Sequence, residues 1–363
     1  MGRDLEEAIE HQPRASAALR AALAAGPSHA YLFRGPRGAG KRAAARAFAA
    51  EILAASSEDP DDARRRALLD PSPHPDLVWL APSGAQHMVE AVRERVIRAA
   101  AYRPFEGGRR VFVIEAAEAM RDESQNALLK TLEEPPGFVH LILLSSEPAA
   151  LLETIVSRCQ PVDFAAAPVE TVEAALAGEA AAEEIAAAAR LAAGDVGLAR
   201  FLLGERGRKL RAQALDLANP PGGDGSPWAA LLDAAEEAGA DAEAAAREAL
   251  EEEAEAGIKR SARDVADEAK RVGRRRRTEV LDLGLALLAA WFRDLAATAA
   301  GVPEAAFNRD RLAELQARAA GLDPNRARQA AELVQDSRRR LDLNVSEELA
   351  LEALFFRLQR LLG

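Results

Sequence analysis

Residues 110–164 alternate between short apolar runs and amphipathic stretches of helical length. The runs at 110–115 and 140–145 are apolar along nearly their whole length, which is typical of strands buried on both faces of a sheet. Between them, residues 123–134 favour a helix, and the sequence Pro-Pro-Gly at 135–137 ends it. Because strands that alternate with helices usually pair in parallel, this region predicts an α/β fold, a parallel sheet with helices on both faces.

A glycine-rich loop, GPRGAGK at residues 35–41, precedes this region. It follows a short apolar run at 29–33 and leads into a helical pattern at 42–54, which is the context that a phosphate-binding loop requires. In such a loop, backbone N–H groups and a helix N-terminus surround an anion, and a lysine neutralises it. The candidate phosphate-binding residues are Gly35, Gly38, Gly40 and Lys41.

The groups that would hold a metal ion and a water molecule beside this loop are altered. A serine or threonine hydroxyl normally follows the lysine and holds Mg²⁺, but here the residue is Arg42. The strand ends in Glu115, a degenerate metal position, and Ala116 follows where a carboxylate would orient the attacking water. General-base help of this kind is worth about 10²–10⁴ in rate, so we expect a nearly inert site. Glu118 is the alternative carboxylate, but a turn there would aim it elsewhere.

Arg158 lies at a predicted corner between a helix and a strand. A guanidinium can contact two phosphate oxygens at once and stays charged at any relevant pH. When a neighbouring subunit supplies such an arginine finger, phosphoryl transfer is accelerated about 10³–10⁵-fold. On spacing alone, a solvated arginine or one that pairs with a helix end is the simpler interpretation. Cys159 beside it is most simply a small buried residue.

The composition limits the class of protein. A chain of 363 residues is too long for one core and suggests two or three domains, and its many alanines favour helices. The net charge of −11 opposes non-specific binding to nucleic acid, so any contact with DNA must come from a local patch. The single cysteine excludes an intrachain disulfide and a zinc site built from several cysteines.

The sequence also predicts a cytoplasmic protein that does not enter a membrane. Its first residues carry charges where a signal peptide needs an apolar run. The most apolar segment, residues 280–292, is shorter than the roughly 20 residues that a membrane span requires, and it contains Asp282.

The sequence predicts three domains, at residues 1–165, 166–206 and 207–363. Strand signals end after Phe164, residues 169–203 form a small helical pattern, and the remainder is helical throughout. A highly charged stretch at 242–277 is read as a solvated helix face, with contact to DNA or an acidic partner as the alternative. Residues 56–73 are polar and bounded by proline, and we interpret them as an excursion from the fold.

Several motifs closely resemble bacterial sliding-clamp loader subunits, which are AAA+ proteins. They are NALLKTLEEPP at 126–136, Ser-Arg-Cys at 157–159, HAYLFRGPRGAGK at 29–41 and HPD at 74–76. Within this family the best match is the degenerate ATPase subunit of the DNA polymerase III clamp loader. The resemblance covers about residues 10–203, and NVSEELALEALFFRL at 344–358 supports it.

This resemblance implies an AAA+ P-loop module, a small helical lid domain and an all-α collar domain that assembles a pentamer. It also implies that Arg158 acts as a finger in trans, and that Arg200 occupies the sensor region of a site without activity. The implied partners are the tau/gamma and delta subunits, primed DNA within the complex, and the sliding clamp, whose contact can be indirect. The chain would be a component of the DNA polymerase III holoenzyme, a DNA-directed DNA polymerase, with no ATPase activity of its own.

The resemblance also sets expectations for cofactors. No cofactor is required, and passive binding of ATP or ADP stays open. Related subunits carry a four-cysteine zinc module near residues 56–73, where this chain has no cysteine, so no zinc is expected.

Two other interpretations stay open on the sequence. The chain can be an active clamp-loader ATPase of the tau/gamma type, although Arg42 and Ala116 oppose that. It can also be an unrelated nucleotide-dependent remodeller or switch protein that shares only the phosphate loop, although the motifs at 126–136 and 157–159 oppose that. ATP turnover by the purified chain and association with clamp-loader subunits would separate these three interpretations.

Overall fold

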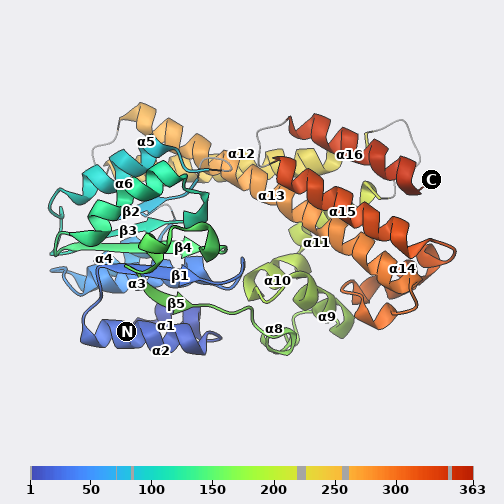
Figure 1. Cartoon of the computed structure of the whole chain (residues 1–363), viewed down its shortest axis with the longest axis horizontal. Helices are drawn as coiled ribbons and strands as arrows, with labels where there is room; N and C mark the ends of the chain where they lie inside the picture. The colour runs from blue at the N-terminus through green and yellow to red at the C-terminus, as the bar shows by residue number, and fades with distance from the viewer. Residues whose placement is uncertain are drawn as a thin grey trace. The chain divides into compact units, whose positions relative to one another are not determined.

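The chain divides into two units, each built around its own core. A computed structural model describes residues 2–70, 72–82, 86–218, 226–255, 261–341 and 346–362 (Figure 1). The first unit comprises Met1–Ala166 with Ala246–Asp267, and the second comprises Ala167–Ala245 with Glu268–Gly363. No helix in these described ranges is both long and apolar enough to cross a membrane.

The first unit contains a five-stranded parallel sheet, which confirms the predicted α/β fold. The strands are β1 (Ala30–Arg34), β2 (Leu77–Leu80), β3 (Arg110–Ile114), β4 (Val139–Ser145) and β5 (Gln160–Asp163). Their order across the sheet is β2-β3-β4-β1-β5. Tyr31 of β1 lies opposite Ile142 of β4 on one side and Gln160 of β5 on the other, so β1 is an interior strand.

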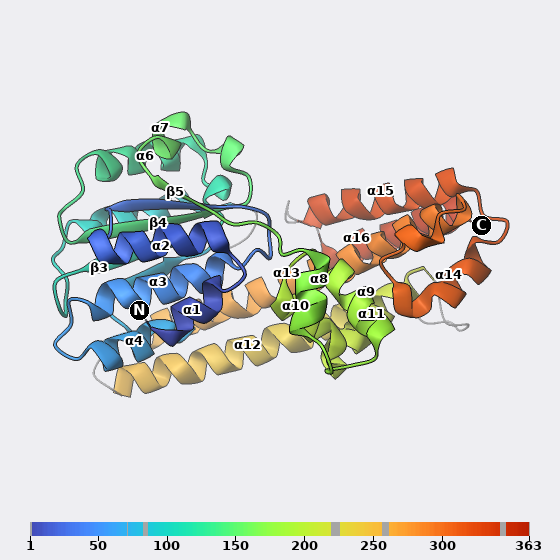
Figure 2. The same ribbon diagram turned by 90° about the horizontal axis from the view of Figure 1, so that it is seen from below.

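Helices cover both faces of this sheet (Figures 1 and 2). One face carries α1 (Arg3–Ile9), α2 (Pro13–Ala25), α3 (Lys41–Ala54) and α4 (Pro60–Leu68). The other carries α5 (Val89–Val92), the π-helix η1 (Arg93–Arg98), α6 (Asp122–Glu133) and α7 (Glu153–Val156). Because side chains alternate along a strand, Tyr31 and Phe33 pack in the first core and Leu32 packs in the second. Each face of the sheet is therefore buried under helices.

The structure corrects the interpretation of residues 56–73 as an excursion from the fold. Helix α4 packs on α3 and begins at the N-cap residue Asp59, whose side chain accepts a hydrogen bond from Asp62 N. Ala63 and Ala67, one turn apart, are fully buried. Two small residues spaced by four form a narrow apolar stripe, which a mostly charged sequence conceals.

The His74-Pro75-Asp76 motif has a structural role. The Asp76 carboxylate is fully buried and accepts the backbone N–H groups of Phe105 and Glu106, each at 2.8 Å. It therefore fixes the segment that leads into β3.

The second unit is helical in the part of the chain that the structure describes. Its shorter helices are α8 (Val169–Ala175), α9 (Ala182–Leu191), α10 (Val196–Leu203), α11 (Glu205–Asp216) and α14 (Leu312–Ala319). The longer ones are α12 (Ala229–Glu255), α13 (Ala262–Ala299), α15 (Pro324–Leu341) and α16 (Glu347–Leu362), with α12 and α13 continuing into the first unit.

Helices α12 and α13 approach closely at two glycines. A Cβ on Gly273 would lie 2.8 Å from Gly239 O, which is too close for any other residue. Helices α8–α10 pack with Leu283 and Leu287 of α13. The division into three domains at residues 165 and 206 stays a prediction, since α8–α10 and the later helices fall in one unit.

Candidate functional site

The glycine-rich loop lies between β1 and α3, as its motif predicts. Gly35 has φ 150°, and a Cβ there would lie 2.1 Å from Phe164 O, so only glycine fits. Gly38 and Gly40 also have positive φ angles, 77° and 83°. Gly40 is the N-cap residue of α3, and the helix begins at Lys41. The structure therefore brings the four predicted phosphate-loop residues together at a helix N-terminus.

The ammonium group of Lys41 is satisfied by the protein itself. Its Nζ donates to Gly35 O at 2.5 Å, to Pro36 O at 2.7 Å and to Ser146 Oγ at 3.2 Å. A lysine ammonium has three N–H donors, so these contacts use them all. Burial lowers the pKa of Lys41 to about 8, against the opposing influence of the Glu118 carboxylate. A phosphate bound here would have to replace some of these acceptors.

Arg42 lies beside Glu115, the residue predicted at a degenerate metal position. Its guanidinium is 2.7 Å from the carboxylate of Asp70 and 3.7 Å from Glu115 Oε2. The same Glu115 oxygen accepts a hydrogen bond of 3.0 Å from Trp79 Nε1. Trp79 also lies beneath the guanidinium of Arg46, 4.4 Å from its ring centre. The carboxylate that would bind a metal is therefore engaged by an internal cation and an indole N–H.

The structure corrects the expectation that Glu118 points away from the loop. Ala116 adopts a left-handed conformation with φ 48°, and the 3₁₀ turn Ala117–Ala119 follows it. This path returns Glu118 to the loop, where its Oε1 accepts the backbone N–H of Ser146 at 3.0 Å. Its other oxygen is buried without a hydrogen-bond partner in the described structure. Sequence reasoning missed Ser146, which contacts both Lys41 and Glu118 and carries no motif of its own.

Within the described residues, no group of three or more histidine, cysteine, aspartate or glutamate side chains is placed to hold a metal ion.

Arg158 follows α7 at the predicted corner. Its backbone N–H donates to Ile155 O at 3.1 Å, which fixes the backbone position from which the side chain extends. Nη1 donates to Thr154 O at 2.9 Å, and Nη2 lies 2.6 Å from Glu133 Oε1. The side chain is 34% exposed. Arg158 is thus accessible at the surface of its unit but held in one orientation.

Cys159 packs in the core beneath α6 and α7. Burial raises the pKa of its thiol to about 12, so the sulfur stays protonated and unreactive. This agrees with its interpretation as a small buried residue.

Arg200 belongs to the second unit, on α10. Its Nε and Nη2 donate to the carboxylate of Glu179 at distances of 2.9–3.1 Å. The guanidinium is engaged in this exposed pair, and a sensor role stays a prediction.

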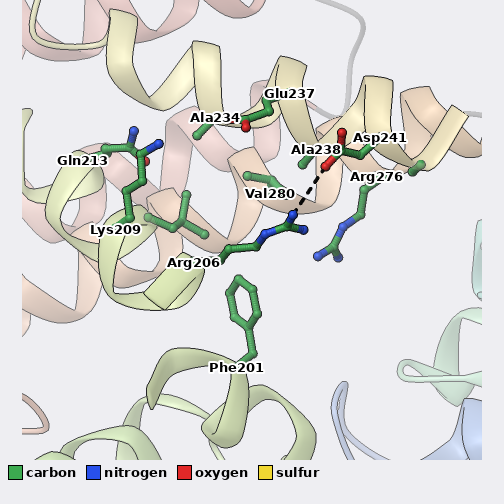
Figure 3. A pocket seen from close by; sticks show the side chains of 12 residues that line it. Phe201, Arg206, Lys209, Gln213, Ala234, Glu237, Ala238, Asp241, Arg276 and Val280 are labelled. Carbon is green, nitrogen blue, oxygen red and sulfur yellow. Dashed lines mark ion pairs between the residues drawn. The ribbon is translucent and has the colours of Figure 1, made fainter. Parts of the chain in front are cut away.

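The second unit also contains a groove of 480 Å³ among α10, α11, α12 and α13 (Figure 3). Phe201 and Val280 provide apolar surface, and Arg206, Lys209 and Arg276 provide positive charge. Arg206 lies 3.7 Å from Asp241, and Arg276 lies 3.3 Å from Glu279. The charges of the groove are largely balanced by these internal pairs. No sequence motif marked it.

The parallel sheet, the phosphate loop at its edge and the helical continuation define an AAA+ P-loop protein. Residues 11–168 match the model of the family described as DNA polymerase III, delta subunit. This region of the chain is therefore similar to the DNA polymerase III subunits that the family model describes. The particular subunit that it resembles is the one named delta prime.

The chain is 39% identical over 201 residues to DNA polymerase III subunit delta prime of Pseudomonas aeruginosa, covering 52% of this chain and 60% of that protein. It is 36% identical over 172 residues to the delta prime subunit of Escherichia coli, covering 46% and 50%. It is also 35% identical over 171 residues to subunit gamma/tau of Mycobacterium tuberculosis, covering 46% and 29%. The chain thus spans 60% or less of the length of these relatives.

Among solved structures, a DNA polymerase III gamma subunit-related protein of Thermotoga maritima has a TM-score of 0.49 at 14% identity. The match covers 96% of this chain and 99% of that one.

Proposed function

We propose that this chain is a delta-prime subunit of the clamp loader, which helps to load the sliding clamp onto primed DNA without hydrolysing ATP itself. The observation that carries the proposal is that Glu115, at the predicted metal position, is already paired with other side chains. Glu115 is paired with Arg42 and Trp79, and Ala116 offers no carboxylate to orient water. Mg²⁺ in such sites stabilises the charge that develops during phosphoryl transfer, so a site closed to the metal loses its main catalytic group.

Nucleotide is not required for this role. Lys41 has its three donors satisfied by the loop and by Ser146, so the loop is stable without an anion. Binding of ATP or ADP, if it occurs, would be passive and would exchange these internal hydrogen bonds for phosphate contacts.

The active role in the proposal belongs to Arg158, acting on a neighbouring ATPase subunit. The side chain is 34% exposed, and the Arg158 backbone is held to the preceding helix by the hydrogen bond from its N–H to Ile155 O. The neighbour would be a tau/gamma-type subunit, and the delta subunit would complete the loader. Contact with the clamp can be direct or through these partners.

One observation favours a second function, that of an active ATPase of the tau/gamma type. Glu118 lies beside the loop with a buried, unpaired oxygen, and its carboxylate is placed to take over from the residue replaced at Ala116. We favour the first function because Arg42 still opposes the metal.

ATP turnover by the purified chain tests the two functions. The delta-prime function expects background turnover that the change Glu118→Gln leaves unaltered. Turnover that needs Mg²⁺ and disappears in Glu118→Gln would establish the ATPase instead. Reconstitution with tau/gamma and delta subunits, read out as clamp loading on primed DNA, tests whether the chain takes part in loading the sliding clamp.

A further inference from the structure

The guanidinium of Arg158 is held by two different elements of the first unit. One contact is to α7, the helix that precedes it, since Nη1 donates to Thr154 O at 2.9 Å. The other comes from α6, whose last residue Glu133 places Oε1 2.6 Å from Nη2. The two contacts use two of the five N–H donors that a guanidinium carries. The remaining donors stay available for an incoming anion.

The end of α6 that carries Glu133 is firmly anchored. Leu128 and Leu132 on the opposite side of the helix are buried in the sheet core. Pro135 and Pro136 follow the end of the helix. Val139 N, at the start of β4, donates to Pro136 O at 2.8 Å. The Glu133 backbone is therefore fixed relative to the sheet, which limits the positions that its carboxylate can reach.

Gln125 ties α6 to the helix that carries the arginine. Its side chain is almost fully buried, and its Oε1 accepts the N–H of Leu152, the N-cap residue of α7, at 2.8 Å. Its Nε2 donates to Met120 O at 2.9 Å. The backbones of Glu133 and Arg158 thus belong to one connected arrangement, and the two side chains meet between them.

We propose that Glu133 is a positioning residue for Arg158, which orients the guanidinium before the neighbouring subunit's phosphate arrives. The inference rests on the proposed function of Arg158 as a finger in trans. An arginine side chain has many rotamers, and ordering one at an interface has an entropic cost that pre-organisation removes. The pair is also partly exposed, with 34% of Arg158 and 48% of Glu133 accessible. Such pairs are weak, so Glu133 can orient the guanidinium without competing strongly against a multiply charged phosphate.

This role depends on a hydrogen-bond acceptor more than on a negative charge. The amide oxygen of glutamine can accept from Nη2 at the same position, whereas alanine removes the contact altogether. Glu134 provides a matched control, because it is the adjacent carboxylate and follows the last residue of the same helix.

The test uses the full chain reconstituted with tau/gamma and delta subunits, with ATP turnover measured in the presence of clamp and primed DNA. Glu133→Ala should lower kcat about 2–10-fold, which is the cost of ordering one free side chain, and should leave KM for ATP unchanged. Glu133→Gln should retain most of the activity, and Glu134→Ala all of it. Glu133→Ala should have no further effect in an Arg158→Ala background.

Each outcome decides a different claim. If Arg158→Ala itself changes nothing, the proposed finger function fails, and this inference fails with it. If Arg158→Ala lowers turnover but Glu133→Ala does not, only the positioning role is wrong. A rise in kcat for Glu133→Ala would show that the carboxylate competes with phosphate instead. Equal losses in Glu133→Ala and Glu134→Ala, with a lower thermal midpoint in both, would show a structural effect at the helix end.

Discussion

The guanidinium of Arg42 lies 3.7 Å from the carboxylate of Glu115, the residue that the sequence predicts at a degenerate metal position. Trp79 donates to the same carboxylate oxygen, and Asp70 Oδ2 lies 2.7 Å from Nη2 of the guanidinium. Under the proposed function, the guanidinium of Arg42 replaces an exchangeable divalent cation with a covalently attached monovalent one. Phosphate-loop geometry is thus separated from metal-dependent chemistry under this proposal.

The first prediction concerns this separation. The purified chain should hydrolyse ATP at background rate, because Arg42 opposes metal binding and Ala116 cannot polarise water. Steady-state phosphate release with and without Mg²⁺ measures this, with Lys41→Ala as the reference. A turnover that needs Mg²⁺ and is abolished in Lys41→Ala would contradict it.

The second prediction follows from the buried lysine. Burial lowers the pKa of Lys41 to about 8 in the folded chain, below the model-compound value of 10.5. Between these two values the unfolded chain binds more protons than the folded chain, so the stability contribution of this group rises with pH. Relative to Lys41→Met, the wild-type chain should gain on the order of 2 kcal/mol in free energy of unfolding between pH 7.5 and pH 10. Urea denaturation of both chains at the two pH values measures the difference, and an unchanged difference would show that the folded-state pKa is not lowered.

The third prediction tests the packing of α4 on α3. Ala67 is fully buried there, so Ala67→Leu should overpack the contact and lower the free energy of unfolding by about 1–3 kcal/mol. Arg65 on the same helix is 67% exposed, and Arg65→Ala should change it by less than about 0.5 kcal/mol. Chemical denaturation of both variants measures the two values. Equal, small effects would mean that the segment does not contribute to the core.

The sequence predicted the features that depend on local pattern. Apolar strands and the glycine spacing lead directly to the parallel sheet and to the loop at Gly35, because both are determined by neighbours in the chain. Three features could not be found this way. Helix α4 depends on two buried alanines, Glu118 returns to the loop through the left-handed Ala116, and Ser146 joins it from the end of another strand. The first is concealed by the charged residues around the alanines, and the other two depend on contacts between segments far apart in sequence, for which no local signal exists.

The last prediction concerns Arg158 and separates assembly from catalysis. Its backbone is held by the hydrogen bond to Ile155 O, and its side chain is partly exposed, so Arg158→Ala should leave folding and assembly intact. Removing the guanidinium withdraws charge stabilisation from the transition state at the adjacent subunit only, and turnover at that site should fall about 10³-fold or more. Arg158→Lys should recover little, because an ammonium cannot make the two-pronged contact to phosphate. Nucleotide binding by the partner should change much less than its turnover, since the finger acts mainly on the transition state.

Three measurements test this prediction for Arg158. They are size-exclusion chromatography of the reconstituted complex, nucleotide affinity of the partner and single-turnover ATP hydrolysis. A variant complex that assembles and hydrolyses ATP at the wild-type rate at every site would reduce Arg158 to a surface arginine paired with Glu133.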